Sequence, residues 1–253
     1  MKISIARNCG FCSGVRRAID IARNNAPAHT LGPLVHNKRV ISQLEEIGVH
    51  VTESPDIDGT IITRAHGTPK EEIREGMVDA TCPGVYSLHQ AALEFEEKGY
   101  HVLVYGDKDH AEMKALISYL HDAEVTKDPL AYDKPVACVS QTTMNPGMFR
   151  AFVDDIKRLN PKAVHKDTIC RATQKRQRAA IDLAKKVDLM IVIGGFHSSN
   201  TCKLAEVCKP YCPTYHIESG IPDEVWKAGH VGITAGASTP DEQIQEVCQI
   251  LQK

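Results

Sequence analysis

Short apolar runs alternate with longer amphipathic segments along almost the whole chain. Runs such as 101–105, 136–140 and 189–193 have the length of buried strands, and the segments between them carry apolar residues at helical spacing. Strands that alternate with helices are typical of α/β units with parallel or mixed sheets. The pattern therefore predicts an α/β fold.

The same pattern places the individual elements. We expect strands at residues 2–6, 49–51, 60–63, 101–105, 136–140, 163–166, 189–193 and 231–234. We expect helices at residues 15–25, 38–48, 70–76, 85–98, 111–120, 146–159, 171–186, 201–209 and 241–252. No low-complexity linker divides these elements, so the chain is either one large domain or several small domains packed together.

Three cysteines share one local arrangement, in which the cysteine follows an apolar segment and precedes a helix-like run. They lie in Gly10-Phe11-Cys12-Ser13-Gly14, in Asp79-Ala80-Thr81-Cys82-Pro83-Gly84 and in Asp167-Thr168-Ile169-Cys170. A buried thiol is the ordinary interpretation of any one of them, but their shared placement indicates three repeated units. A thiolate at a helix N-terminus suits a metal or an iron–sulfur cluster. We expect the three turns to meet at one centre, where three ligands leave one coordination site open.

Composition and charge narrow the class of protein. The chain has 253 residues, a formal net charge of -2 and nine cysteines. A near-neutral chain without a long basic run is not expected to bind nucleic acid. The longest apolar run is far too short for a membrane span, and the first residues lack a secretory signal pattern. An odd number of cysteines without such a signal favours metal or redox chemistry in a soluble, cytoplasmic protein.

Polar residues gather where the predicted strands end, which is the edge at which ligands bind in open α/β folds. They include histidines at positions 36, 66 and 110, an acid at position 112, and the hydroxyl and amide groups of Ser140-Gln141-Thr142-Thr143, Ser198-Ser199-Asn200 and Ala235-Gly236-Ala237-Ser238. A solvated loop residue is the ordinary alternative for any one of them. Together, His36, His66, His110, Ser198, Asn200 and Ser238 have the chemistry to hold a diphosphate. Beside a metal-bound alcohol, Glu112 would be the natural proton donor.

Nine short motifs stand in a fixed order between Arg7 and Pro240. They are Gly10-Phe11-Cys12-Ser13-Gly14-Val15, Val35-His36-Asn37, Ala65-His66-Gly67, Asp79-Ala80-Thr81-Cys82-Pro83, His110-Ala111-Glu112, Ser140-Gln141-Thr142-Thr143, Asp167-Thr168-Ile169-Cys170, Ser198-Ser199-Asn200 and Ala235-Gly236-Ala237-Ser238. In this order they closely resemble the 4-hydroxy-3-methylbut-2-enyl diphosphate reductases, the LytB or IspH family. So many ordered matches are highly specific.

The resemblance implies a fold and a cofactor. The fold would be three small pseudo-symmetric α/β lobes in a cloverleaf around a central iron–sulfur cluster. The lobes would span residues 13–82, 83–168 and 169–253, with residues 1–12 contributing at the centre. The cluster would be of the 4Fe-4S type, with Cys12, Cys82 and Cys170 as its ligands and one iron without a protein ligand.

The resemblance also implies an oxidoreductase activity. The family reductively removes the hydroxyl of (E)-4-hydroxy-3-methylbut-2-enyl diphosphate, which gives isopentenyl and dimethylallyl diphosphate in the last step of the non-mevalonate (MEP) isoprenoid pathway. Glu112 would supply a proton, Thr142 would contact the substrate hydroxyl or relay to it, and His110 would assist near Glu112. The substrate would be bound by His36, His66, His110, Thr142, Ser198, Ser199, Asn200 and Ser238. A small ferredoxin or flavodoxin would be the expected electron donor.

Two departures from the family pattern leave alternatives open. Phe196-His197 precedes Ser198, where the family more often has lysine and asparagine, and Asp107-Lys108-Asp109 replaces a glycine-rich approach to His110. One alternative is therefore a paralogue that reduces another unsaturated or hydroxylated substrate at the same cluster. A second is a zinc-stabilised binding protein that uses the cysteines at positions 202, 208 and 212. Cys9 and Cys12 have the C-x-x-C spacing and are a further candidate pair of metal ligands, although a zinc ribbon normally needs two such pairs.

Overall fold

The structure is a computed structural model in which residues 1–252 are described. These residues form two compact units. The first unit comprises Met1–Arg16, Val35–Gln43 and the chain from Arg171 onward, and the second comprises Arg17–Leu34 and Leu44–Cys170. Each unit is therefore assembled from segments that lie far apart in the sequence.

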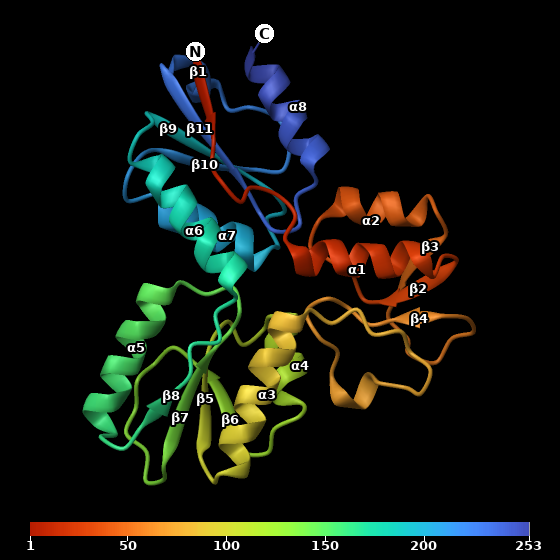
Figure 1. The fold of residues 1–253 in the computed structure, drawn as a ribbon, viewed down its shortest axis with the longest axis vertical. Helices are drawn as coiled ribbons and strands as arrows, with labels where there is room; N and C mark the ends of the chain where they lie inside the picture. Colours follow the sequence, from red (N-terminus) through yellow and green to blue (C-terminus); the bar gives the residue numbers. More distant parts are fainter. Residues whose placement is uncertain (253) are drawn as a thin grey trace. The chain divides into compact units, whose positions relative to one another are not determined.

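The elements of the chain are short strands and helices in near-regular alternation (Figure 1). The strands are β1 (Lys2–Ile5), β2 (Ala28–Leu31), β3 (Val49–Thr52), β4 (Ile61–Ile62), β5 (His101–Tyr105), β6 (Ala123–Thr126), β7 (Val136–Ser140), β8 (Val164–His165), β9 (Leu189–Ile193), β10 (Thr214–Ile217) and β11 (His230–Ala235). The helices are α1 (Ser13–Asn24), α2 (Lys38–Glu45), α3 (Pro83–Glu97), α4 (Ala111–Ile117), α5 (Pro146–Leu159), α6 (Arg171–Ala184), α7 (Ser199–Cys208) and α8 (Asp241–Gln252), with the 3₁₀ helices η1 (Lys70–Glu72) and η2 (Asp223–Lys227). Within residues 1–252, no helix has both the length and the apolar character of a membrane span.

The strands form three parallel sheets, which confirms the predicted α/β class. The first unit contains one sheet in the order β1-β11-β9-β10, and the second contains two, in the orders β3-β2-β4 and β6-β5-β7-β8. The strands of each sheet come from one of the three predicted lobe ranges, apart from β1, which comes from residues 1–12. The lobe boundaries themselves stay a prediction.

The core of the first unit lies on both faces of its sheet, which explains why β9 is apolar throughout. Leu189, Ile191 and Ile193 share one cluster with Ile244, Val247 and Leu251 of α8. Met190 and Val192 point to the opposite face, where they pack against α6 and α7. Because successive side chains of a strand alternate between faces, a strand covered on both sides needs apolar residues at every position.

The four-stranded sheet of the second unit is built in the same way. Val102 and Val104 of β5 pack with α3 and α4, whereas Leu103 and Tyr105 pack with the aromatic side chains Phe149 and Phe152 of α5. Helices on both faces of a parallel sheet leave its carboxyl edge as the place where loops can present polar groups.

Several helices begin at or directly after a residue that the sequence analysis assigned to the site. Cys82 is the N-cap of α3 and is followed by Pro83, a residue favoured at the first helical position. His110 caps α4, and Ser198 caps α7 by accepting a hydrogen bond from the Thr201 N–H. The strand–turn–helix units therefore place these side chains at the carboxyl ends of the strands.

Candidate active site

Two of the three predicted cysteine ligands lie side by side in the second unit. Cys82 caps α3, and Cys170 immediately precedes α6. A β-carbon added to Gly84 would lie 3.6 Å from the Cys170 sulfur and 3.8 Å from the Cys82 sulfur. The glycine therefore leaves a space beside both sulfurs that any other residue would fill.

The repeated acid before these cysteines has the same structural role in both turns. One carboxylate oxygen of Asp79 accepts a hydrogen bond from the Thr81 N–H at 3.0 Å, and one of Asp167 accepts from the Ile169 N–H, also at 3.0 Å. Such a bond from an aspartate to the backbone two residues later fixes a local turn. The shared sequence pattern therefore produces one shared turn that leads into each cysteine.

Each cysteine turn is also tied through its backbone to another loop of the site. The Cys82 N–H donates to the Ala65 carbonyl at 3.0 Å, and the Cys170 N–H donates to the Thr142 carbonyl at 3.0 Å, both in the second unit. In the first unit, the Cys12 N–H donates to the Ala237 carbonyl at 3.2 Å. These bonds cannot be predicted from the sequence, because a main-chain bond between distant loops leaves no side-chain signal.

The donor set of these turns fits an iron–sulfur cluster. Backbone amides stabilise thiolates, and the Cys12 sulfur already accepts a bond from the Val15 N–H at 3.4 Å. The space beside Gly84 is open to a group larger than a hydrogen atom. Within residues 1–252, no three His, Cys, Asp or Glu side chains are grouped as a metal site.

Glu112 is a buried acid that is held by Thr142. Only 1% of the surface of Glu112 is exposed to solvent. One carboxylate oxygen accepts from the Thr142 N–H at 2.7 Å, and the other accepts from the Thr142 hydroxyl at 2.7 Å. Burial raises the pKa of Glu112 to about 7, and the two bonds from Thr142 oppose that rise. The structure therefore brings together the two residues predicted to act on the substrate hydroxyl.

His110 lies beside this acid, and His66 packs against His110 in the same unit. The Nδ1 atom of His110 accepts a bond from the Glu112 N–H at 3.1 Å, so the neutral ring carries its proton on Nε2. The rings of His66 and His110 meet edge to face, with their centroids 5.6 Å apart. The cap that starts α4 therefore also orients a polar N–H of His110.

The first unit holds the remaining predicted substrate-binding residues. The Ser238 hydroxyl donates to the backbone carbonyl of His36 at 3.4 Å. Ser198 begins α7, Ser199 and Asn200 form its first turn, and the buried Asn200 Nδ2 has no hydrogen-bond partner among the described residues. A buried amide without a partner is rare, and a bound acceptor such as a phosphate oxygen would satisfy it.

The predicted site residues therefore fall into two sets. The second unit brings together His66, Cys82, His110, Glu112, Thr142 and Cys170, and the first unit contains Cys12, His36, Ser198, Ser199, Asn200 and Ser238. That the two sets form one site stays a prediction.

The other six cysteines are buried or partly buried free thiols. Burial raises the pKa of Cys9, Cys138 and Cys208 to about 12, so these groups are neutral thiols near pH 7. The Cys202 thiol donates to the Phe196 carbonyl at 3.1 Å. Within residues 1–252, the cysteines at positions 202, 208 and 212 form no group of three potential metal ligands, so the structure gives the zinc alternative no support.

Comparison with known proteins decides the family. The family model described as LytB protein matches residues 3–252. The chain is 39% identical to a protein of Alkaliphilus oremlandii, over 98% of each chain, and 38% identical to one of Clostridioides difficile, over 100% of this chain and 99% of the other. The chain belongs to the LytB family. Both LytB relatives carry the name 4-hydroxy-3-methylbut-2-enyl diphosphate reductase, and the resemblance seen in the motifs is confirmed.

Solved structures of LytB relatives share the fold. The E-1-hydroxy-2-methyl-but-2-enyl-4-diphosphate reductase of Plasmodium falciparum matches with a TM-score of 0.93 at 27% identity, over 100% of this chain and 88% of that chain. A second structure, described as (E)-4-hydroxy-3-methyl-but-2-enyl diphosphate reductase, the terminal enzyme of the non-mevalonate pathway, matches with a TM-score of 0.70 at 35% identity over 99% of both chains. The predicted fold class is confirmed at the level of the whole chain.

Proposed function

We propose that this LytB chain is a 4-hydroxy-3-methylbut-2-enyl diphosphate reductase that converts its substrate to isopentenyl and dimethylallyl diphosphate. The observation that carries the proposal is the buried Glu112–Thr142 pair, an acid with a pKa of about 7 bound to a hydroxyl. Such a pair suits proton delivery to a leaving hydroxyl at neutral pH. The names of the relatives supply the substrate class.

We assign Cys12, Cys82 and Cys170 as the ligands of a 4Fe-4S cluster. All three stand at helix starts with backbone amides nearby, and Gly84 leaves space beside two of the sulfurs. When bound, such a cluster supplies electrons and a Lewis-acidic iron. The expected external electron donor is a small ferredoxin or flavodoxin, and the expected location is the cytoplasm.

The chain's own residues would carry out the proton transfers. The reaction consumes two electrons and two protons: the carbon–oxygen bond breaks, the hydroxyl leaves as water with one proton, and the allylic fragment takes the other proton on carbon. Protonated Glu112 can donate to the Thr142 hydroxyl, which in turn can donate to the substrate hydroxyl. The Thr142 hydroxyl lies 2.7 Å from the carboxyl group and donates to it in the structure, so the relay requires this bond to reverse when Glu112 is protonated. His110, whose ring accepts a bond from the Glu112 N–H, would assist the proton transfer next to Glu112.

The diphosphate would be held away from the bond that breaks. His36, His66, Ser198, Ser199, Asn200 and Ser238 offer imidazole, hydroxyl and amide donors, which suit phosphate oxygens. The partnerless Asn200 amide supports this assignment. Binding energy from a remote group positions the reacting atoms, so these residues would act through orientation rather than through proton transfer.

An anaerobic assay tests the function directly. Purified protein reconstituted with iron and sulfide, given a chemical reductant and the hydroxylated diphosphate, should release both C5 diphosphates. Cluster-loaded protein that leaves this substrate unchanged would contradict the proposal and favour a paralogue with another substrate. Protein that contains zinc, without iron or sulfide, would contradict the cofactor assignment.

The pH dependence of kcat/KM should show a single descending limb near neutral pH. The active form of Glu112 is protonated, and burial raises its pKa to about 7, so activity is retained below this value and lost as the pH rises through it. At pH values above about 7, kcat/KM should fall about tenfold for each pH unit. The measurement is kcat/KM from about pH 6 to about pH 9, with wild type and Glu112→Gln compared. A limb that persists unchanged in Glu112→Gln would assign the titration to another group.

A further inference from the structure

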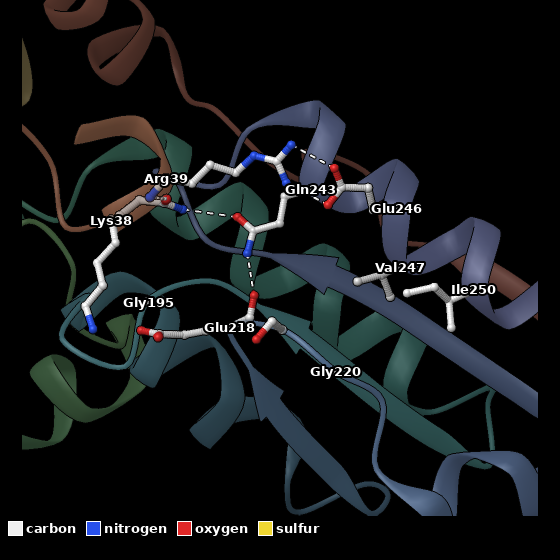
Figure 2. A pocket seen from close by; sticks show the side chains of 11 residues that line it. Lys38, Arg39, Gly195, Glu218, Gly220, Gln243, Glu246, Val247 and Ile250 are labelled. Carbon is white, nitrogen blue, oxygen red and sulfur yellow. Dashed lines mark hydrogen bonds and ion pairs between the residues drawn. The ribbon is translucent and has the colours of Figure 1, made fainter. Parts of the chain in front are cut away.

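A chain of side-chain hydrogen bonds connects the two substrate-binding segments of the first unit. One segment contains His36 and leads into α2, and the other runs from Gly194, just after β9, to Asn200 in the first turn of α7. Beside them is a pocket of about 320 Å³, whose walls come from the start of α2, from α8 and from the residues after β10. Figure 2 shows Gln243 of α8 in the middle of this pocket, with dashed bonds to both sides.

On the His36 side, the anchor is Asn37. Its side-chain oxygen accepts from the Arg39 N–H at 3.0 Å and from the Val40 N–H at 3.3 Å, so Asn37 caps α2. Its amide nitrogen donates to the Gln243 side-chain oxygen at 3.2 Å. The residue next to His36 is therefore fixed both to its own helix and to α8.

On the side of the Gly194–Asn200 segment, the anchor is Glu218, the residue after β10. The Gln243 amide nitrogen donates to the Glu218 backbone carbonyl at 2.6 Å. One carboxylate oxygen of Glu218 accepts from the Phe196 N–H at 2.8 Å, two residues before Ser198. A bond between a carboxylate and a backbone N–H is charge-assisted and stronger than a neutral one.

The two segments also touch directly. A β-carbon added to Gly195 would lie only 2.7 Å from the backbone carbonyl of His36. The Ser238 hydroxyl donates to the same carbonyl. A side chain at position 195 would not fit against this carbonyl, so the two segments lie in close contact.

We propose that Gln243 and Glu218 are positioning residues that hold the His36 segment and the Gly194–Asn200 segment at the separation required by a diphosphate. This inference rests on the proposed function. Neither residue belongs to the predicted diphosphate-binding set, and a carboxylate near a diphosphate would oppose binding by its charge. The contribution of Glu218 is therefore geometric: it preorganises the Gly194–Asn200 segment, which lowers the ordering cost of binding.

Inorganic pyrophosphate is the probe, because its binding can be measured without turnover. The holoenzyme and its variants are titrated with pyrophosphate by calorimetry under anaerobic conditions. Gln243→Ala and Glu218→Ala should each bind about tenfold more weakly than wild type. Glu218→Gln keeps an oxygen acceptor for the Phe196 N–H and should bind within about twofold of wild type. With the full substrate, both alanine variants should raise KM about tenfold, with much smaller changes in kcat.

Glu246→Ala is the matched control. Glu246 of α8 forms a bidentate ion pair with Arg39 of α2 on the exposed side of the pocket (Figure 2). Its replacement removes a contact between these two helices and leaves the bonds of Gln243 and Glu218 in place. Its pyrophosphate affinity should equal that of wild type. If Glu246→Ala weakens binding as much as Gln243→Ala, the effect is general helix packing, and the positioning role is wrong. Alanine variants that bind like wild type overturn the positioning role but leave the diphosphate site intact, whereas wild type that does not bind pyrophosphate overturns both.

Discussion

Replacing Glu112 with glutamine should lower kcat by a factor of about 10² to 10⁴, the usual range for the loss of a general acid. Glutamine has the size of the carboxyl group and can still accept the bond from the Thr142 N–H, but it has no proton to transfer. Substrate binding should change little, because the predicted diphosphate contacts lie elsewhere. The measurement is single-turnover and steady-state kinetics on protein with matched iron content.

Two further measurements separate a lost proton donor from a damaged fold. The pKa of Glu112 is higher in the folded protein than in the unfolded chain. The stability that this group contributes is therefore present at pH values below its unfolded-chain pKa, and it is lost as the pH rises through about 7. At higher pH, wild type holds a buried charge that Glu112→Gln lacks, so the variant should melt at the same temperature or higher. Glu46→Gln alters an exposed carboxyl group and should keep full activity. Full activity in Glu112→Gln would refute the assignment of the proton donor.

The sequence predicted the helices better than the strands. Every predicted helix is present, although residues 70–76 contain only the 3₁₀ helix η1. The strands β2, β6 and β10 were not predicted. β6 and β10 lie at sheet edges and carry polar residues such as Glu124 and His216, so they lack the continuous apolar signal of β5 or β9. Pairing with a buried neighbour, rather than intrinsic propensity, makes these residues strands.

The places of the candidate side chains at strand ends and helix starts could be predicted from the sequence, but the backbone contacts that support them could not. The positions of the cysteines, of Glu112 and of Ser198 follow from residue type beside a strand end or a helix start. The backbone carbonyls that hold the cysteine turns, such as that of Ala65, carry no sequence signal. Asn37 could have been recognised as a cap from its place before α2, whereas its bond to Gln243 joins residues 206 positions apart in the sequence.

Cys170→Ser should lose its iron–sulfur cluster, and with it the proposed activity. A serine hydroxyl is a hard and weakly acidic ligand, whereas iron–sulfur clusters are held by soft thiolates. Only three cysteines are assigned as ligands, so the loss of one leaves no protein ligand in reserve. We expect iron and acid-labile sulfide per chain to fall about tenfold or more after anaerobic reconstitution, together with the brown colour.

The fold around position 170 should survive this change, which makes the cluster loss interpretable. The bond from residue 170 to the Thr142 carbonyl uses the backbone N–H, which serine retains, and Asp167 still fixes the preceding turn through the Ile169 N–H. Cys212→Ser is the matched control, because Cys212 is a partly exposed thiol outside the assigned ligand set. It should keep wild-type iron and sulfide. If Cys170→Ser retains a full cluster, or Cys212→Ser loses one, the ligand assignment is wrong, because the thiolate at the start of α6 would not be what holds the iron.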